Sequence, residues 1–127
     1  MKPTVAVIGA SSDRRKYGNK AVRAHIAAGF EVFPIHPTET VVEGLPVYRT
    51  LADVPADRLD RVTVYLPPAK VLEMLGTLTS KSIGTFILNP GTSNAEVLAE
   101  AERLSLKPIT GCSILAAGVT PDQFPDE

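Results

Sequence analysis

The segment VAVIGASSDRRKYGNKAV, residues Val5 to Val22, decides how this sequence folds. A short β-branched run, typical of a buried strand, ends at Gly9-Ala10-Ser11-Ser12. Three basic residues then lead towards a helix pattern that begins at Asn19. A turn from a strand into a helix presents backbone N–H groups and the positive end of the helix dipole to an anion. The segment therefore predicts a phosphate-binding turn after the first strand of an α/β protein.

Strand and helix patterns alternate along the rest of the chain. Strands are expected at 4–8, 31–35, 61–66, 85–88 and 107–110, with helices at 19–28, 67–78 and 93–104. Ser93 and Glu96 have the spacing of a capping box. The alternation predicts an α/β, three-layer, doubly wound, Rossmann-like fold with a parallel five-stranded sheet of order 3-2-1-4-5. We expect one domain over residues 1–127, in which residues 110–127 form a strand end and an irregular tail.

Length and composition are those of an ordinary globular protein. The chain has 127 residues, 44% of them hydrophobic, and one cysteine, so it can bury a core but cannot form an intramolecular disulfide. It has neither a run of about 20 apolar residues nor a signal-peptide pattern. We expect a cytoplasmic protein without membrane contact. A homodimer or an enzyme partner stays open.

Positive charge gathers around the opening turn. Residues 1–36 contain six Lys or Arg and two acids, whereas residues 37–127 contain seven bases and twelve acids. A nucleic-acid surface would need a longer basic face and stacking aromatics, and only 6% of the residues are aromatic, none of them Trp. The distribution favours a small anionic ligand and argues against nucleic acid.

The residues that follow each strand form the candidate site, because ligands of doubly wound sheets bind at the carboxyl ends of the strands. They are mostly small, uncharged and rich in Gly and Pro: 9–12, 36–38, 67–68, 89–93 and 111–113. Small residues let a ligand approach the backbone. The sequence shows no carboxylate pair, His–Asp pairing or metal-ligand spacing. We therefore expect a binding protein without catalytic residues and without a metal.

An NAD(P) site is the first alternative. The dinucleotide fingerprint requires G-x-G-x-x-G after the first strand and an acid at the end of the second. Only Gly9 fits, because Ser11 and Arg14 occupy the later glycine positions. The second strand is followed by His36, and Glu39 comes three residues later. An NAD(P)-binding regulatory domain and a ligand-free interaction scaffold both stay open.

Motifs at the strand ends suggest a different ligand. VIGASSD, PIHP, YLPP, NPGT and GCS follow the five predicted strands in this order. With them the sequence, over about residues 4–118, resembles the small single-domain CoA-binding proteins. Their Rossmann-like domain is related to the N-terminal domain of the succinyl-CoA synthetase α subunit. The resemblance implies a CoA or acyl-CoA ligand. It does not imply ligase activity, because the phosphorylated histidine of the synthetase belongs to a second domain, absent from these 127 residues.

The resemblance also implies roles for individual residues. The CoA phosphates would contact Gly9, Ala10, Ser11 and Ser12. The adenosine would lie near Pro37 and Thr38, with Leu66 and Pro67 opposite. The pantetheine arm would be approached by Asn89, Pro90 and Gly91. Cys112 matches a cysteine common at the last strand of the family; it either faces the thiol end of CoA or is an inert buried thiol, since free cysteines are usually buried.

Several side chains near the turn have two interpretations. Arg14 and Lys16 either pair with ligand phosphates or belong to a solvated loop. Tyr17 either stacks on adenine or packs against the helix. His36 is a candidate ligand contact because it stands at a strand end, whereas His25 is expected on the surface.

Overall fold

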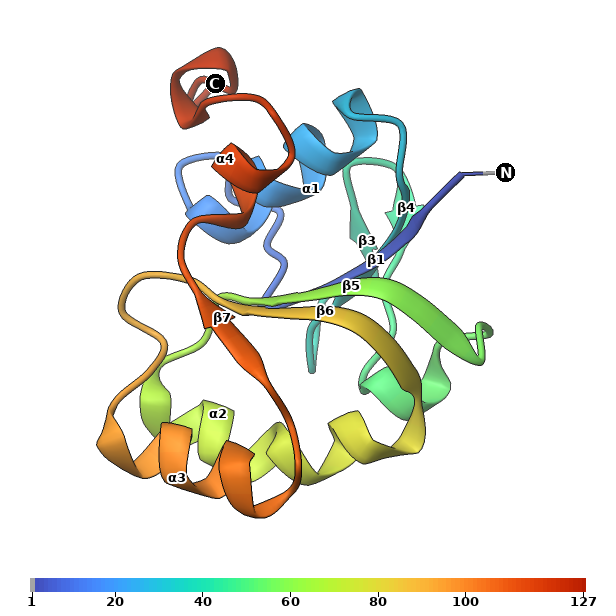
Figure 1. Cartoon of the computed structure of the whole chain (residues 1–127). Coiled ribbons are helices and arrows are strands. Elements are labelled where there is room, and N and C mark those ends of the chain that lie inside the picture. The colour runs from blue at the N-terminus through green and yellow to red at the C-terminus, as the bar shows by residue number, and fades with distance from the viewer. Residues whose placement is uncertain (1) are drawn as a thin grey trace.

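The computed structural model describes residues 2–127 and contains a five-stranded parallel sheet between two layers of helices (Figure 1). The sheet strands are β1 (Thr4–Ile8), β2 (Glu31–Ile35), β5 (Arg58–Val64), β6 (Ser82–Leu88) and β7 (Pro108–Thr110), and a small hairpin consists of β3 (Val41–Val42) and β4 (Leu45–Pro46). The α-helices are α1 (Tyr17–Ala27), α2 (Pro68–Met74), α3 (Ala95–Arg103) and α4 (Ser113–Ala116). Three 3-10 helices are η1 (Leu51–Asp53), η2 (Leu75–Ser80) and η3 (Pro121–Gln123). Among these described helices none is long and apolar enough to cross a membrane.

Both faces of the sheet are buried, which explains why its strands are almost continuously apolar. Side chains alternate between the two faces along β1. Val5 and Val7 pack with Val22 of α1, on the side that α1 and α4 cover (Figure 1). Ala6 and Ile8 belong to the other core, which α2 and α3 cover.

The predicted fold class is confirmed. The strand order differs from the predicted 3-2-1-4-5 in the position of the third sheet strand. The observed order is β2-β1-β5-β6-β7, so the third sheet strand in the chain, β5, pairs with β1 and not with β2. The outer edge of β2 is covered instead by the segment after β4. The Tyr48 N–H donates to the Pro34 carbonyl, and the His36 N–H donates to the Tyr48 carbonyl, both at 3.0 Å. In either order the connections change direction beside β1, where a ligand crevice is expected.

The residues after β7 are not the irregular tail that the sequence predicts. They contain α4 and η3, and Ile114 of α4 is fully buried in the core beside β1 and α1. Phe124, further along, also packs against this core. A helix of four residues is too short to show the apolar periodicity by which helices are recognised.

The start of α3 differs by one residue from the capping-box prediction. The N-cap is Asn94, not Ser93, because the Asn94 side-chain oxygen accepts a hydrogen bond from the Val97 N–H at 2.8 Å. Asn and Ser are equally good at this position. The spacing alone therefore does not decide between the two neighbours.

The expectation that His25 lies on the surface is wrong. The side chain is fully buried and packs edge-on against the Phe30 ring, with the ring centroids 5.0 Å apart. Its Nδ1 lies 2.8 Å from the Ala21 carbonyl oxygen and its Nε2 lies 3.2 Å from a guanidinium nitrogen of Arg61. Burial lowers the pKa of the imidazole. A neutral ring with both nitrogens bonded is compatible with the core.

Candidate functional site

Gly9 closes the end of β1 between β2 and β5. Its φ of +89° is a left-handed conformation that glycine adopts readily. The N–H groups of Gly9 and Ala10 donate to the Ile35 carbonyl at 3.0 and 3.2 Å. A Cβ atom at Gly9 would lie 2.4 Å from the Tyr65 carbonyl oxygen. Glycine is therefore required by the close approach of two strand ends.

Gly18 brings the start of α1 onto the end of β1. A Cβ atom here would lie 2.2 Å from the Gly9 carbonyl oxygen. Close helix–strand packing is the role of the last glycine of a dinucleotide fingerprint. Gly18 does not fit the fingerprint spacing because it stands nine residues after Gly9, across a loop that is longer than the fingerprint allows.

Three cavities lie in a row across the carboxyl ends of the strands. The first, about 120 Å³, is beside the end of β2; the second, about 340 Å³, is over the start of α1; the third, about 260 Å³, is beside Cys112. The first and second share Gly9 and Leu66. The second and third share Tyr17, Tyr65 and Pro90. We call these three cavities the strand-end groove.

The second cavity has an anion-binding character. Lys16, Tyr17 and Gly18 line it at the start of α1. The first N–H groups of a helix have no partner within the helix, and in the described part of the chain no hydrogen bond uses the N–H of Tyr17 or Gly18. The Lys16 side chain is exposed, and within residues 2–127 it forms no ion pair. These groups together present positive charge to the groove.

Ser12, by contrast, is already bonded to an acid. Its N–H donates to the two carboxylate oxygens of Glu39 at 3.1 and 2.9 Å, and its hydroxyl contacts the same carboxylate. Ser11 is buried, and its hydroxyl accepts from the Asp13 N–H at 3.0 Å. In this structure, then, the N–H and hydroxyl of Ser12 and the hydroxyl oxygen of Ser11 already have partners within the protein.

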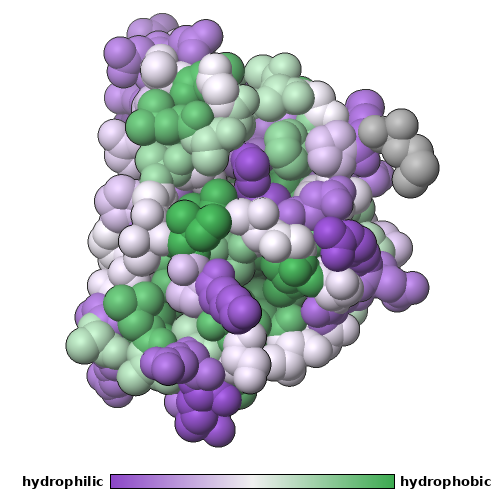
Figure 2. Space-filling model, in the orientation of Figure 1, coloured by the Kyte–Doolittle hydropathy of each residue, from purple (hydrophilic) through white to green (hydrophobic). Residues whose placement is uncertain are grey.

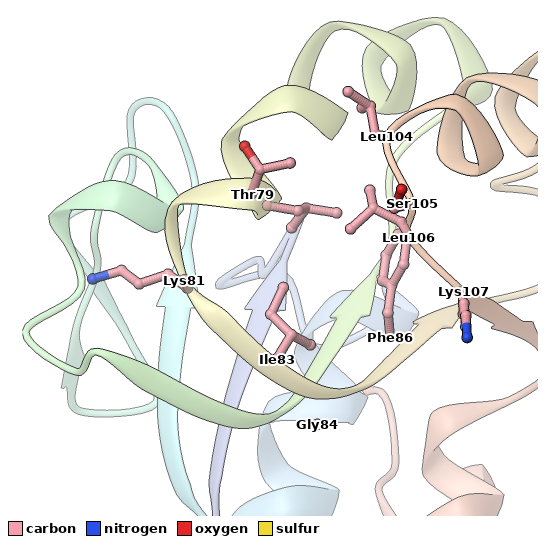
Figure 3. Close-up of a pocket in the computed structure, with 10 residues that line it drawn as sticks. Thr79, Lys81, Ile83, Gly84, Phe86, Leu104, Ser105, Leu106 and Lys107 are labelled. Carbon is pink, nitrogen blue, oxygen red and sulfur yellow. The ribbon is translucent and has the colours of Figure 1, made fainter.

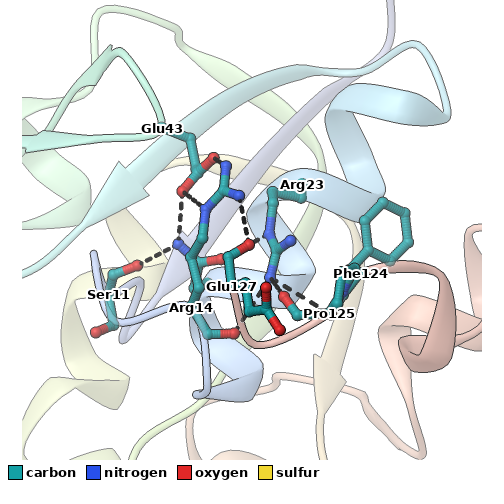
Figure 4. A network of polar contacts seen from close by, with 8 residues as sticks. Ser11, Arg14, Arg23, Glu43, Phe124, Pro125 and Glu127 are labelled. Carbon is teal, nitrogen blue, oxygen red and sulfur yellow. Dashed lines mark hydrogen bonds and ion pairs between the residues drawn. The ribbon is translucent and has the colours of Figure 1, made fainter.

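The basic residues of the loop also bind partners within the chain. Arg14 donates to the Glu43 carboxylate at 3.1 and 2.6 Å and to the Glu127 carbonyl at 2.8 Å (Figure 4). The Arg14 guanidinium holds the pKa of Glu43 below its usual value. Arg15 pairs with Asp13 at 2.9 Å and lowers the pKa of that carboxyl to about 2. Neither arginine lines the groove.

His36 shapes the turn beside the first cavity. Its Nδ1 accepts hydrogen bonds from the N–H groups of Thr38 and Glu39 at 3.1 and 3.0 Å. The Nδ1 atom is therefore unprotonated, and any hydrogen on the ring is on Nε2. His36 and Pro37 line the first cavity together with Arg49.

A buried polar cluster centred on Asn89 lies at the wall of the third cavity. The Asn89 amide donates to the Thr63 hydroxyl at 2.6 Å and to the Val64 carbonyl at 2.8 Å, and its oxygen accepts from the Ser113 N–H at 2.8 Å. The amide thus connects β5, β6 and the start of α4. Cys112, the N-cap of α4, is half-buried and lines this cavity.

The groove brings most of the predicted residues together. Those that line it are Gly9, Lys16, Tyr17, His36, Pro37, Leu66, Pro67, Asn89, Pro90, Gly91 and Cys112. Those outside the three cavities are Ala10, Ser11, Ser12, Arg14 and Thr38. The lining residues that sequence reasoning missed include Gly18, Arg49, Tyr65 and Pro121. Within residues 2–127 no group of three or more His, Cys, Asp or Glu side chains could hold a metal.

A larger cavity, about 390 Å³, lies at the other end of β6, between η2 and the segment that joins α3 to β7 (Figure 3). Its walls include Ile83, Phe86 and Leu106. Hydrophobic and hydrophilic residues are interspersed over the face of the molecule shown in Figure 2. Lys81 points away from the cavity and donates to the Val54 carbonyl at 2.8 Å (Figure 3). This cavity is far from the carboxyl ends of the strands, so we do not include it in the candidate site.

Comparison with known families identifies the chain. Residues 3–118 match the family model of the CoA binding domain. The chain belongs to the CoA binding domain family. Membership supports CoA as the ligand, and the matched residues include all of the strand-end groove except Pro121. A comparison with curated protein sequences gives no match.

Solved structures share the fold. A conserved hypothetical protein from Pyrococcus furiosus is 24% identical, with a TM-score of 0.79 over 91% of this chain and 99% of that one. A hypothetical protein from Pyrococcus horikoshii OT3 is 19% identical, with a TM-score of 0.80 over 94% and 82%. The dinucleotide-forming acetyl-coenzyme A synthetase 1 of Ca. Korarchaeum cryptofilum is 26% identical, with a TM-score of 0.69 over 84% of this chain and 25% of the synthetase.

Proposed function

We propose that the chain binds CoA or acyl-CoA along the strand-end groove and carries out no chemistry of its own. The observation that carries this proposal is the row of three joined cavities across the carboxyl ends of the strands. A long ligand with a nucleotide at one end and a flexible arm at the other suits such a row. The likeness to part of an acetyl-coenzyme A synthetase is a second support.

The diphosphate would lie in the second cavity. The free N–H groups of Tyr17 and Gly18 and the ammonium of Lys16 are suited to its oxygens. Ser12 is less suited, because a phosphate there would have to displace the Glu39 carboxylate or meet its negative charge. The proposal therefore moves the phosphate contacts from the serines towards the first turn of α1.

The two ends of CoA would occupy the outer cavities. The adenosine part would lie against the first cavity, beside His36 and Pro37, which at about 120 Å³ takes only part of it, and the third would hold the end of the pantetheine arm near Cys112. Asn89 would act through its position below the arm, since its amide hydrogens already have partners.

Isothermal titration with CoA, acetyl-CoA, NAD and ATP tests the proposal. We expect CoA or acetyl-CoA to bind and the Lys16→Gln variant to bind roughly threefold to tenfold more weakly, because one charge-assisted contact is lost. Lys107→Gln, an exposed lysine outside the groove, is the matched control and should bind like the wild type.

Two outcomes would overturn it. Tighter binding of NAD than of either CoA species would favour an NAD(P) regulatory domain. Failure of all four nucleotides at millimolar concentration, with the protein folded, would favour a ligand-free scaffold.

A further inference from the structure

A chain of hydrogen bonds runs from Asn89 to Tyr65 at the wall of the third cavity. Both amide hydrogens of Asn89 are used, one on the Thr63 hydroxyl and one on the Val64 carbonyl. The Thr63 hydroxyl accepts from the amide, so its own hydrogen goes to the Ser113 hydroxyl, at 2.8 Å. Every donor up to this point is accounted for.

The donor in the hydrogen bond between Ser113 and Tyr65 can be assigned because Ser113 is buried. Ser113 is fully buried, and its hydroxyl hydrogen needs a partner. Among the described residues, the oxygen left to accept it is the Tyr65 phenol oxygen, at 2.9 Å. Ser113 therefore donates to Tyr65, and the phenol hydrogen of Tyr65 is left without a partner inside the protein.

Tyr65 stands where a ligand would meet this free donor. It lines both the second and the third cavity. Burial raises the pKa of its phenol to about 12, so the group stays protonated at neutral pH. A ligand therefore has to accept a hydrogen bond from this phenol.

The rest of the third cavity offers mainly apolar surface. Pro90, Pro121 and Cys112 contribute to its walls, and the Asn89 amide is fully bonded. The volume, about 260 Å³, exceeds what a thiol alone would fill, since one water-sized group occupies about 30 Å³. The cavity thus has room for a short aliphatic group next to one hydrogen-bond donor.

We propose that the third cavity binds the acyl end of a short-chain acyl thioester of CoA, with the Tyr65 phenol donating to the thioester carbonyl and the acyl chain against Pro90, Pro121 and Cys112. This inference depends on the proposed function, because the arm of CoA must first lie in the groove. Free CoA ends in a thiol, which has neither the carbonyl nor the apolar group.

Titration with acetyl-CoA and S-ethyl-CoA tests the inference, because the two ligands have nearly the same size and only acetyl-CoA has the carbonyl. In the wild type we expect acetyl-CoA to bind about twofold to tenfold more tightly, as one neutral hydrogen bond predicts. Tyr65→Phe keeps the ring and removes the donor, so it should abolish the difference. Tyr48→Phe, a tyrosine outside the groove, should keep it.

A series of acyl lengths tests the apolar walls. Affinity should rise roughly fourfold for each methylene from acetyl to butyryl. Equal affinities for acetyl-CoA and S-ethyl-CoA in the wild type, or an unchanged ratio in Tyr65→Phe, would overturn the inference while leaving CoA binding intact. Absence of binding by every CoA species would instead overturn the proposed function.

Discussion

Single residues decide how closely α1 approaches β1, and Gly18 is the clearest case. A Cβ atom at this position would lie 2.2 Å from the Gly9 carbonyl oxygen, so Gly18→Ala must push the helix away from the strand. The helix propensity of Ala would return at most about 1 kcal/mol. We expect a net loss of about 1–3 kcal/mol in the free energy of unfolding, measured by urea denaturation.

Gly76→Ala is the matched control for that loss. Gly76 lies in η2, and a Cβ atom there would meet nothing within 4 Å. This variant should be as stable as the wild type or slightly more so. A Gly18→Ala protein with wild-type stability would show that α1 can shift at no cost.

His25 predicts a stability that depends on pH. Burial holds its folded-state pKa below the unfolded value of about 6.5, so the unfolded chain binds more protons below that pH. The free energy of unfolding should therefore fall as the pH drops from about 6.5 towards the folded pKa, by at most about 1.4 kcal/mol per pH unit. Denaturation at a series of pH values measures this. His25→Phe should flatten the curve in this window; a curve that this variant leaves unchanged contradicts the assignment.

Arg23 of α1 contacts the segment after α4 and holds it against the helix. The Arg23 guanidinium donates to the Pro125 carbonyl at 2.8 Å and lies over the Phe124 ring, 5.9 Å from its centroid (Figure 4). Its Nε donates to the Asn19 side chain at 2.8 Å. Arg23→Met should speed amide hydrogen exchange in residues 122–127 and cost about 1–2 kcal/mol of stability.

Arg103→Met is the control, because Arg103 pairs with Glu100 on the exposed side of α3. Surface pairs of this kind contribute about 0–1 kcal/mol. Its exchange pattern after residue 118 should match that of the wild type. Equal exchange in the Arg23 variant would show that the apolar contacts of Phe124 are sufficient to hold the segment.

The sequence was informative where an element is long enough to show a period. β1 and β2 have the predicted bounds, and eleven of the sixteen predicted site residues line one groove, eight of them residues that follow a predicted strand. The two-residue strands β3 and β4 and the four-residue α4 are too short for any period. The pairing of Ser12 with Glu39 could not be predicted either, because folding brings together two residues that are 27 positions apart in the sequence.

For the whole molecule, the switch in strand order beside β1 explains why the groove has a middle and two ends. The first cavity lies beside β2, on one side of the switch, and the third lies beyond β6, on the other. Only the second cavity, at the start of α1, lies between them. A ligand bound across the switch must therefore contact elements that are distant in the sequence.

This arrangement predicts that the nucleotide half and the pantetheine half of CoA can bind at the same time, in neighbouring cavities. Adenosine 3',5'-diphosphate should occupy the first and second cavities, and pantetheine the third. Each fragment should bind weakly, and the joined molecule more tightly than either, because linking makes the second contact intramolecular. Ligand-observed NMR should show both fragments bound together and CoA displacing both. Mutual competition between the fragments, or displacement of only one by CoA, would mean that a single cavity is used and that the row of cavities is not the path of the ligand.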